Sequence, residues 1–304
     1  MTAAAELSTI VVSWRSSADV VRLVASFPAG ARHELVVVDN AGESELARLA
    51  APSLRVIAPG RNLGFAGGCN LGARASTAPL LLFLNPDAEP VDDALDRLLE
   101  GFALRGDAAG LVPRLVDDAG EPQASWQLRE LPAPAALLAH AFFWNPGRRR
   151  REPAPGTPIG QPAAAALALR RDAFESIGGF DERFVPAWFE DVDLARRLAA
   201  AGKSLLYWPA ATFRHRVGSS VATLGYGRFL RIYDRNLARY LRIHHGRGWE
   251  LAFRALVPIG ALARLAALPL RRPLRATSRR SAAADLLDAA RAAFEGWSER
   301  EPAA

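Results

Sequence analysis

Three carboxylates within four residues, Glu190, Asp191 and Asp193, form the densest group of side chains in this sequence that could do chemistry. Like charges this close repel one another unless a cation or a substrate proton lies between them. The aromatic residues Trp188 and Phe189 come directly before, which indicates that the carboxylates emerge from an apolar wall. One of them could act there as a general base. Alternatively, Glu190 and Asp191 only complement the dipole of a helix start.

The residues that follow indicate how this group is positioned. Leu194 and Leu198 have helical spacing, Gly202 is suited to end the helix, and residues 205–208 are typical of a short buried strand. A helix of about eleven residues advances roughly 16 Å, and a strand of about five residues covers roughly the same distance. A chain that doubles back at Gly202 would therefore return His215 to the carboxylates. One carboxylate and one imidazole could then form a site.

Apolar runs earlier in the chain predict an α/β fold. Strands are expected at residues 7–14, 35–38, 54–57, 80–84 and 109–116, with helices at 18–27 and 92–104. Short links between them predict an open sheet, in which ligands bind outside the carboxyl ends of the strands. Trp14 and Asp39 stand at such ends. Asp39 could accept hydrogen bonds from a ribose or a base, or could close a solvated turn.

Two further stretches are suited to phosphate and metal. Residues 61–72 contain four glycines and two asparagines, which allow a turn that cradles a nucleotide or pyrophosphate, although such glycines also serve tight packing. Asn85 and Asp87 follow the strand at 80–84, where they could hold a hard divalent cation or form an ordinary turn. No G-x-G-x-x-G follows the first strand, which excludes a nicotinamide dehydrogenase.

The composition limits the class of protein. The chain has 304 residues and one cysteine, Cys69, so no intrachain disulfide can form and a reducing compartment is expected. We find no signal peptide and no apolar run long enough to span a membrane, so we expect a cytoplasmic protein, peripheral at most at the inner face of the plasma membrane. Residues 1–200 carry a net charge of −5, and residues 201–304 carry +11. The basic part should favour anions.

The order of these motifs resembles glycosyltransferase family 2 with a GT-A fold, particularly its rhamnosyltransferase-like branch. Seven stretches within about residues 7–220 carry the resemblance, namely IVVSW (10–14), VVVDN (36–40), NLGFAGGCNLG (62–72), LNPDA (84–88), GGFDE (178–182), EDVDL (190–194) and His215. The resemblance implies an open mixed sheet flanked by helices, with a catalytic domain over residues 1–222. A basic, amphipathic, helical region is expected over 223–304.

The resemblance also implies an inverting, metal-dependent transfer of a sugar, rhamnose or similar, from a nucleotide-diphosphate donor to a glycan or lipid-linked acceptor in cell-surface polysaccharide synthesis. Asp191 corresponds to the base, Asp87 and His215 to ligands of Mn²⁺ or Mg²⁺, and Trp188 and Glu190 lie toward the acceptor. The donor side takes in Ser13, Trp14, Asp39, Asn62, Gly67, Gly68, Asn70, Asn85 and Asp87. The branch makes dTDP-rhamnose one candidate donor.

Two positions depart from the family pattern. Asn85 stands where the first acid of the D-x-D element is expected, and residues 161–164 read QPAA where a Ser-Gly-Ala element is usual. A sugar-nucleotide pyrophosphorylase is a rival interpretation, but it would need a lysine in a loop after the first strand, and the chain's only lysine is Lys203. A non-catalytic membrane-surface scaffold with a degenerate transferase fold is another rival, which retention of Asp87, Asp191 and His215 opposes.

The C-terminal region combines arginines with apolar residues at helical spacing. Residues 249–270 are apolar but interrupted by Arg254, Pro258, Arg264 and Pro269, which argues against a spanning helix. The pattern is typical of a helix on an anionic membrane surface, or of an amphipathic cap on the catalytic domain. It shows no zinc or RNP signature, so we do not expect nucleic acid binding. The sequence leaves an oligomer open.

Overall fold

The computed structural model describes residues 5–27, 32–49, 53–142, 151–216, 224–269 and 278–297. The chain divides into two compact units. Unit 1 comprises residues 1–131, 147–183 and 190–219, and unit 2 comprises 132–146, 184–189 and 220–304. The expected boundary between residues 222 and 223 lies outside the described residues. Sequence order alone did not indicate that 132–146 and 184–189 belong with the C-terminal helices.

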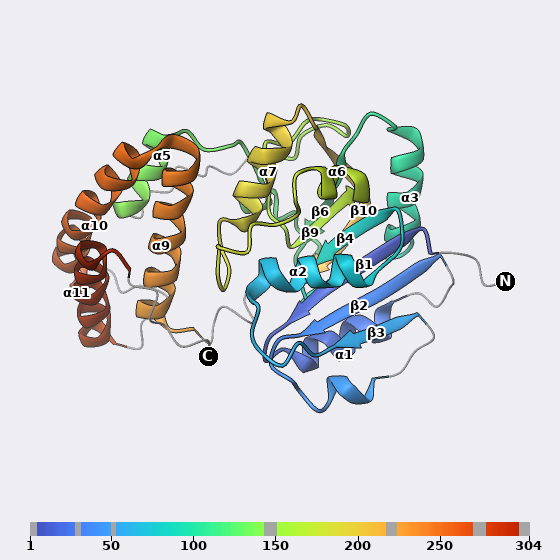
Figure 1. Cartoon of the computed structure of the whole chain (residues 1–304), viewed down its shortest axis with the longest axis horizontal. Coiled ribbons are helices and arrows are strands. Elements are labelled where there is room, and N and C mark those ends of the chain that lie inside the picture. The colour runs from blue at the N-terminus through green and yellow to red at the C-terminus, as the bar shows by residue number, and fades with distance from the viewer. Residues whose placement is uncertain are drawn as a thin grey trace. The chain divides into compact units, whose positions relative to one another are not determined.

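Unit 1 is built on an eight-stranded mixed sheet with the strand order β3-β2-β1-β4-β9-β6-β10-β5 (Figure 1). The strands are β1 (Leu7–Ser13), β2 (His33–Asp39), β3 (Leu54–Ile57), β4 (Leu80–Leu84), β5 (Ala88–Pro90), β6 (Gly110–Val116), β9 (Ala166–Arg170) and β10 (Leu205–His215). The first four strands of this order are parallel, and β9 runs antiparallel to both β4 and β6. A separate pair, β7 (Leu128–Arg129) and β8 (Gln161–Pro162), is antiparallel. The structure thus confirms the predicted open mixed α/β sheet.

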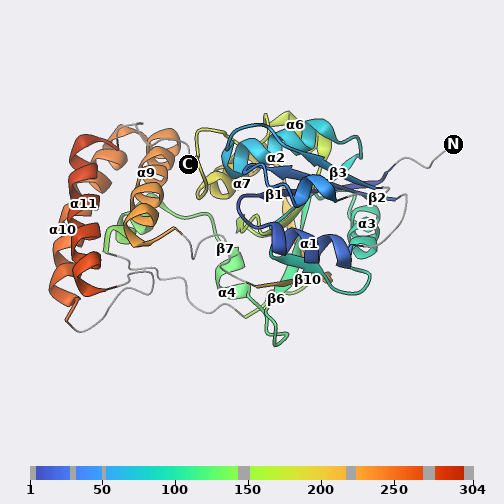
Figure 2. The same cartoon turned by 90° about the horizontal axis from the view of Figure 1, so that it is seen from below.

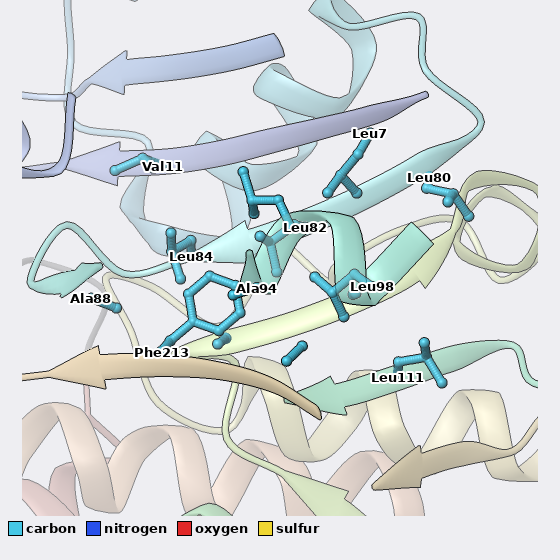
Figure 3. Packing of buried hydrophobic residues seen from close by; sticks show 14 of the residues in the cluster. Leu7, Val11, Leu80, Leu82, Leu84, Ala88, Ala94, Leu98, Leu111 and Phe213 are labelled. Atoms are coloured by element: carbon cyan, nitrogen blue, oxygen red, sulfur yellow. The ribbon is translucent and has the colours of Figure 1, made fainter. Parts of the chain in front are cut away.

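Helices cover both faces of this sheet because its strands are apolar on both sides. Leu7, Val11 and Leu82 belong to the buried cluster that includes α1 (Ser17–Ser26) and α3 (Ala94–Leu104), and Figure 3 shows part of this cluster. Ile10 and Phe83 belong to the cluster on the other face, with residues of α2 (Gly64–Ala75), α6 (Arg171–Ser176) and α7 (Glu190–Ala200). Figure 2 shows α1 and α2 on opposite sides of β1. Alternate side chains of one strand therefore reach opposite layers.

The glycine-rich stretch differs from our expectation, because it forms the helix α2 and not a turn. A β-carbon on Gly68 would lie 2.7 Å from Val12 Cγ1, and one on Gly72 would lie 2.5 Å from Ile10 Cγ2. Both contacts are shorter than packed carbon atoms tolerate, so glycine is required for α2 to approach β1 this closely. The tight-packing alternative is the correct one for these two positions.

The strand β10 is also longer than the predicted one, which covered residues 205–208 only. It continues to His215 after a bulge between Trp208 and Thr212, where its register against β6 shifts. Residues 209–211 supply the bulge and include Pro209, which cannot donate a ladder hydrogen bond. The end of β10 then pairs with β5, so that His215 faces Ala88.

Unit 2 consists mainly of the helices α9 (Tyr226–His245), α10 (Arg247–Ala267) and α11 (Arg279–Glu295), which form a shared apolar cluster. The short α5 (Pro134–Leu138) and η2 (Ala139–Phe142) pack beside α10. A β-carbon on Gly260 would lie 1.9 Å from Ala141 O, so this glycine permits close contact of α10 with η2. Pro258 lies inside α10 without ending it. Among the described residues, no helix has both the length and the apolar character needed to cross a bilayer.

The remaining short helices are α4 (Ala124–Gln127) in unit 1, together with α5 and η2 in unit 2. The 3₁₀ helix η1 (Leu46–Arg48) follows β2.

Candidate active site

The end of β4 brings together Asn85, Asp87 and His215. The chain turns after β4 and returns as β5, whose Ala88 pairs with His215, so that Asp87 is carried to the end of β10. His215 Nε2 lies 3.3 Å from Asp87 Oδ1 and 3.4 Å from Asn85 Nδ2. Asp87 and His215 are both buried, with 6% and 4% exposure. The imidazole therefore meets the carboxylate of Asp87, and the expected pairing with the carboxylates of residues 190–193 is not what the structure shows.

Gln123 determines which imidazole nitrogen of His215 carries the proton. Gln123 Nε2 donates to the His215 carbonyl over 2.8 Å, which turns its Oε1 toward His215 Nδ1 at 3.0 Å. Because Oε1 can only accept, Nδ1 is the protonated nitrogen and Nε2 has a lone pair. This arrangement is the one that a metal-ligating histidine adopts, in which the second nitrogen donates to an outer partner.

Asp87 and His215 fit a divalent cation that takes its other ligands from a substrate. Among the described residues, no group of three or more His, Cys, Asp and Glu side chains could by itself hold a metal ion. A cation such as Mg²⁺ is commonly held by one or two protein groups together with substrate phosphates and water. One carboxylate and one oriented imidazole satisfy that requirement, and Asn85 supplies a further amide beside them.

The carboxylates of α7 differ in how they are neutralised. Asp193 is 1% exposed and pairs with Arg197, whose Nη2 lies 2.6 Å from its Oδ2. Arg197 also donates to the carbonyls of Ile177 and Gly179, both over 2.8 Å. Asp193 is therefore part of a buried structural ion pair. Sequence reasoning missed Arg197, although its spacing of four residues from Asp193 on a helix could have indicated it.

Among the described residues, no cationic side chain forms such an ion pair with Glu190 or Asp191. Burial raises the pKa of Glu190 well above its usual range, and the charges of Asp191 and Asp193 raise it further. One carboxylate oxygen of Glu190, Oε2, is buried without a hydrogen-bond partner. Burial also raises the pKa of Asp191, against the opposing effects of the Val192 N–H, the Arg129 guanidinium and the Ala164 N–H. Burial and the neighbouring carboxylates therefore favour the neutral form of Glu190, which would relieve the repulsion expected from the sequence.

The surroundings of Asp191 include the segment 161–164, one of the two positions at which the sequence departs from the family pattern. Ala164 ends the segment QPAA, and its backbone hydrogen-bonds to Asp191. Arg129 lies on β7, which pairs with β8 at the start of the same segment. Asp191 as a residue is half-buried, and protein groups surround its carboxylate. Arg129 was not identified from the sequence, and the contact of Ala164 with Asp191 could not be foreseen, because each is more than 25 residues from Asp191 along the chain.

The ends of β1 and β2 lie side by side, because Ser13 pairs with Asp39. Asp39 accepts hydrogen bonds from the backbone N–H groups of residues 41–43 over 2.6–3.0 Å, and so it closes the turn after β2. Ser13 Oγ lies 3.0 Å from Ser16 Oγ. Trp14 is half-buried, with the Arg15 guanidinium 4.9 Å from the ring centroid. The structure therefore gathers three of the expected donor-side residues at one sheet edge.

The asparagines of residues 62–70 hold loops in place. Asn62 Oδ1 accepts from Gly64 N over 2.8 Å at the start of α2. Asn70 clamps residues 178–182, since it exchanges two hydrogen bonds of 2.9 Å with the backbone of Phe180 and donates a third to Glu182. Gly67 and Gly68 are buried within α2. The motifs that the sequence shows far apart are thus joined in space.

Trp188 belongs to unit 2 and Glu190 to unit 1, so the chain passes between the units at the residues assigned to the acceptor side. Trp188 is half-buried and has a φ of 74°.

Gln123 could not be identified from the sequence either. It lies 92 residues from His215, and no local pattern of the sequence links the two.

Comparison with known proteins bears on the family and the fold of this chain. The sequence profile of the family "Glycosyl transferase family 2" matches residues 8–178. An N-acetylglucosaminyl-diphospho-decaprenol L-rhamnosyltransferase from Mycobacterium tuberculosis is 28% identical over 300 residues, which cover 90% of this chain and 96% of the relative. A hexosyltransferase of low-salt glycan biosynthesis from Haloferax volcanii is 28% identical over 197 residues, covering 63% of this chain and 61% of the relative.

Solved structures confirm the GT-A fold. A mannosyltransferase from Pyrobaculum calidifontis, in complex with GDP-Man and Mn²⁺, superposes with a TM-score of 0.56 at 17% identity, over 99% of this chain and 89% of that one. The first 349 residues of TarS from S. aureus give a TM-score of 0.51 at 15% identity, over 94% of this chain and 81% of that one. At such identities the similarity establishes the architecture.

Proposed function

The chain belongs to glycosyltransferase family 2, and on that premise we propose that it transfers a hexose from a nucleoside-diphosphate donor to a hydroxyl of a glycan or lipid-linked acceptor. Rhamnose is the first candidate sugar, and dTDP-rhamnose the first candidate donor, because the rhamnosyltransferase from Mycobacterium tuberculosis aligns with 90% of this chain. That relative's name describes a lipid-linked acceptor. We propose that this reaction belongs to the synthesis of a cell-surface polysaccharide.

The observation that carries this proposal is the contrast between Asp191 and its neighbours. Asp193 is paired with Arg197, and burial favours the neutral form of Glu190, so we take Asp191 as the carboxylate of this group that accepts the proton. A general base works best when its pKa is near the operating pH, and burial moves the pKa of Asp191 upward in that direction. We assign Asp191 as the base that deprotonates the acceptor hydroxyl.

The reaction we propose is a single in-line displacement with inversion. The acceptor oxygen forms a bond to the anomeric carbon while the bond from that carbon to the diphosphate oxygen breaks, and the hydroxyl proton passes to Asp191. A retaining route would need a second carboxylate placed as a nucleophile. Asp193 is paired with Arg197, and burial disfavours the charged, nucleophilic form of Glu190, so neither is suited to that role. The anomeric configuration of the product, read by NMR, tests inversion.

On the donor side, we assign Asp87 and His215 as the ligands of a divalent cation. When bound, such a cation supplies positive charge that stabilises the leaving diphosphate. Mn²⁺ is the better candidate, since imidazole suits it more than Mg²⁺. Ser13, Trp14 and Asp39 are assigned to the nucleoside at the ends of β1 and β2. The further donor-side residues Asn62, Gly67, Gly68, Asn70 and Asn85 have partners within the protein, so we assign them to the support of these loops.

A screen of nucleotide sugars tests the function directly. With Mn²⁺ present, the cognate donor should raise the thermal unfolding temperature, and transfer to a short-chain analogue of an N-acetylglucosaminyl-diphospho-polyprenol should follow. Excess EDTA should abolish the transfer. Full activity in EDTA would contradict the metal assignment, and no stabilisation by any nucleotide sugar would contradict the function.

Unit 2 provides a surface suited to a lipid-linked acceptor. Leu251, Ile259 and Leu262 lie along one stripe of α10 and are 47%, 53% and 64% exposed. The net charge of +11 over residues 201–304 would attract anionic lipids, and this attraction is screened over about 10 Å at 0.1 M salt. We therefore propose reversible binding to anionic membranes. Cosedimentation should be strong with anionic liposomes, weaker as salt rises, and absent with neutral ones; equal binding to both would contradict the electrostatic account.

A further inference from the structure

The segment 184–189 of unit 2 has an unusual backbone. It consists of Phe-Val-Pro-Ala-Trp-Phe and leads directly into α7. Trp188 and Phe189 have φ values of 74° and 73°, in the left-handed region that bulky side chains disfavour. Such strained residues persist only where their surroundings over-determine them, and they concentrate at functional sites. The structure shows which residue of unit 2 provides that constraint.

Asn236 of α9 holds this segment through its side-chain amide. It is 0% exposed, and its Nδ2 lies 2.8 Å from Ala187 O, 3.2 Å from Trp188 O and 3.3 Å from Val185 O. The amide orientation is fixed from the other side, because Asn236 Oδ1 accepts from Arg239 Nη1 over 3.1 Å. Arg235 donates to Val185 O as well. Three backbone carbonyls of the segment, those of Val185, Ala187 and Trp188, therefore converge on one buried NH₂ group.

The same face of α9 also packs on the aromatic rings of the segment. Phe229 meets the Trp188 ring edge to face at a centroid distance of 5.2 Å. Tyr233 and Tyr240 lie 5.2 Å and 5.7 Å from the Phe189 ring. Phe189 is 5% exposed, whereas Trp188 is half-buried. Phe189 thus anchors the segment, while part of the Trp188 ring remains available to a ligand.

We propose that Asn236 is a positioning residue that holds Trp188 in the conformation in which it recognises the acceptor. This inference rests on the proposed function, in which Trp188 lies on the acceptor side. No donor ligand or base is assigned to unit 2, so loss of the Asn236 contacts should affect acceptor recognition and leave the donor reaction intact. The acceptor specificity of the enzyme is thereby determined in part by the C-terminal helices.

The test is Asn236→Asp, which keeps the size of the side chain but places a second oxygen against three carbonyls. With dTDP-rhamnose as donor and the short-chain N-acetylglucosaminyl-diphospho-polyprenol analogue as acceptor, the variant should raise the acceptor KM at least tenfold. Hydrolysis of the donor without acceptor should stay within twofold of the wild-type rate. Amide hydrogen exchange over residues 185–189 should accelerate.

Leu286→Ala is the matched control, because Leu286 is 0% exposed in the core of the C-terminal helices and has no part in the segment. It should lower the unfolding temperature while leaving the acceptor KM and the exchange of residues 185–189 unchanged. Asn236→Ala serves if the Asp variant does not fold. A wild-type acceptor KM in the Asn236 variant, or an equal loss of donor hydrolysis and transfer, would overturn the proposal. Absence of transfer by the wild type would instead contradict the proposed function.

Discussion

Unit 1 contains two acidic groups that differ in how their charges are satisfied. At the end of β4, Asp87 and His215 belong to a hydrogen-bonded set that distant Gln123 completes. At the start of α7, three carboxylates stand within four residues, and within the described part of the chain only Asp193 forms an ion pair with a cationic side chain. We propose that the first group binds a cation. We propose that the second leaves Asp191 reactive, because Asp193 is paired with Arg197 and burial favours the neutral form of Glu190.

This difference explains why carboxylates alone are a poor guide to a metal site. The α7 group has the higher density of acidic residues, but burial and mutual repulsion favour protons there. The β4 group has a single acid, but its histidine presents a lone pair because the other nitrogen donates to Gln123. What decides the chemistry is the set of partners around each carboxylate, and the following variants test that distinction.

The largest expected effect is that of Asp191→Asn. If Asp191 is the base, kcat should fall by about 100- to 10,000-fold, the contribution of a positioned proton acceptor, while donor affinity is kept. Asp193→Asn is the comparison, because it breaks a buried ion pair and should destabilise the fold by about 3 kcal/mol. Steady-state kinetics and thermal unfolding of both variants check this. Wild-type turnover in Asp191→Asn would show that the base lies elsewhere.

A smaller effect is expected from Gln123→Leu. The variant removes the acceptor for His215 Nδ1, so the imidazole loses its fixed orientation. Loss of such an outer partner lowers metal affinity by about 10- to 100-fold. Titration of Mn²⁺ against the variant, with activity measured at each concentration, should show a higher Mn²⁺ requirement that saturating metal restores. An unchanged requirement would mean that His215 is not a ligand.

The smallest effect is expected from Glu190→Gln, and it depends on pH. Because the folded pKa of Glu190 is raised, the folded state keeps a proton that the unfolded chain releases above about pH 4.5. Wild-type stability should therefore fall as pH rises from there through the folded pKa. Glu190→Gln has no carboxylate to titrate, so its stability should not fall in this way. The free energy of unfolding of the variant relative to wild type should therefore rise toward alkaline pH, and this difference should vanish near pH 4. Denaturant unfolding of both proteins between pH 4 and 9 measures the free energy of unfolding and checks the direction of this pH dependence.

Much of unit 1 could be predicted from the sequence, since β1 and β4 are uninterrupted apolar runs and α7 has clear helical spacing. The helix α2 could not, because its glycines indicate a turn unless the close approach of β1 is known. From the local pattern alone His215 was expected beside the α7 carboxylates, whereas it lies beside Asp87, the pairing that the family resemblance implied, because the bulge in β10 extends that strand.

The sequence indicated the residue types of the candidate site but not the distant residues that contact them. Asp87, Asp191 and His215 stand out from local patterns, whereas Gln123, Arg129 and Asn236 act through contacts with residues far along the chain. Such contacts depend on strand register and helix packing, which no local pattern encodes.

The most direct test of the account is Mn²⁺ binding in the presence of dTDP, measured by electron paramagnetic resonance or calorimetry on wild type, Asp87→Asn and Asp191→Asn. This measurement requires neither the sugar nor the acceptor to be known. The account predicts that Asp87→Asn weakens Mn²⁺ binding at least tenfold and that Asp191→Asn leaves it unchanged. Equal weakening by both variants, or by Asp191→Asn alone, would contradict the assignment of separate roles to the two acidic groups.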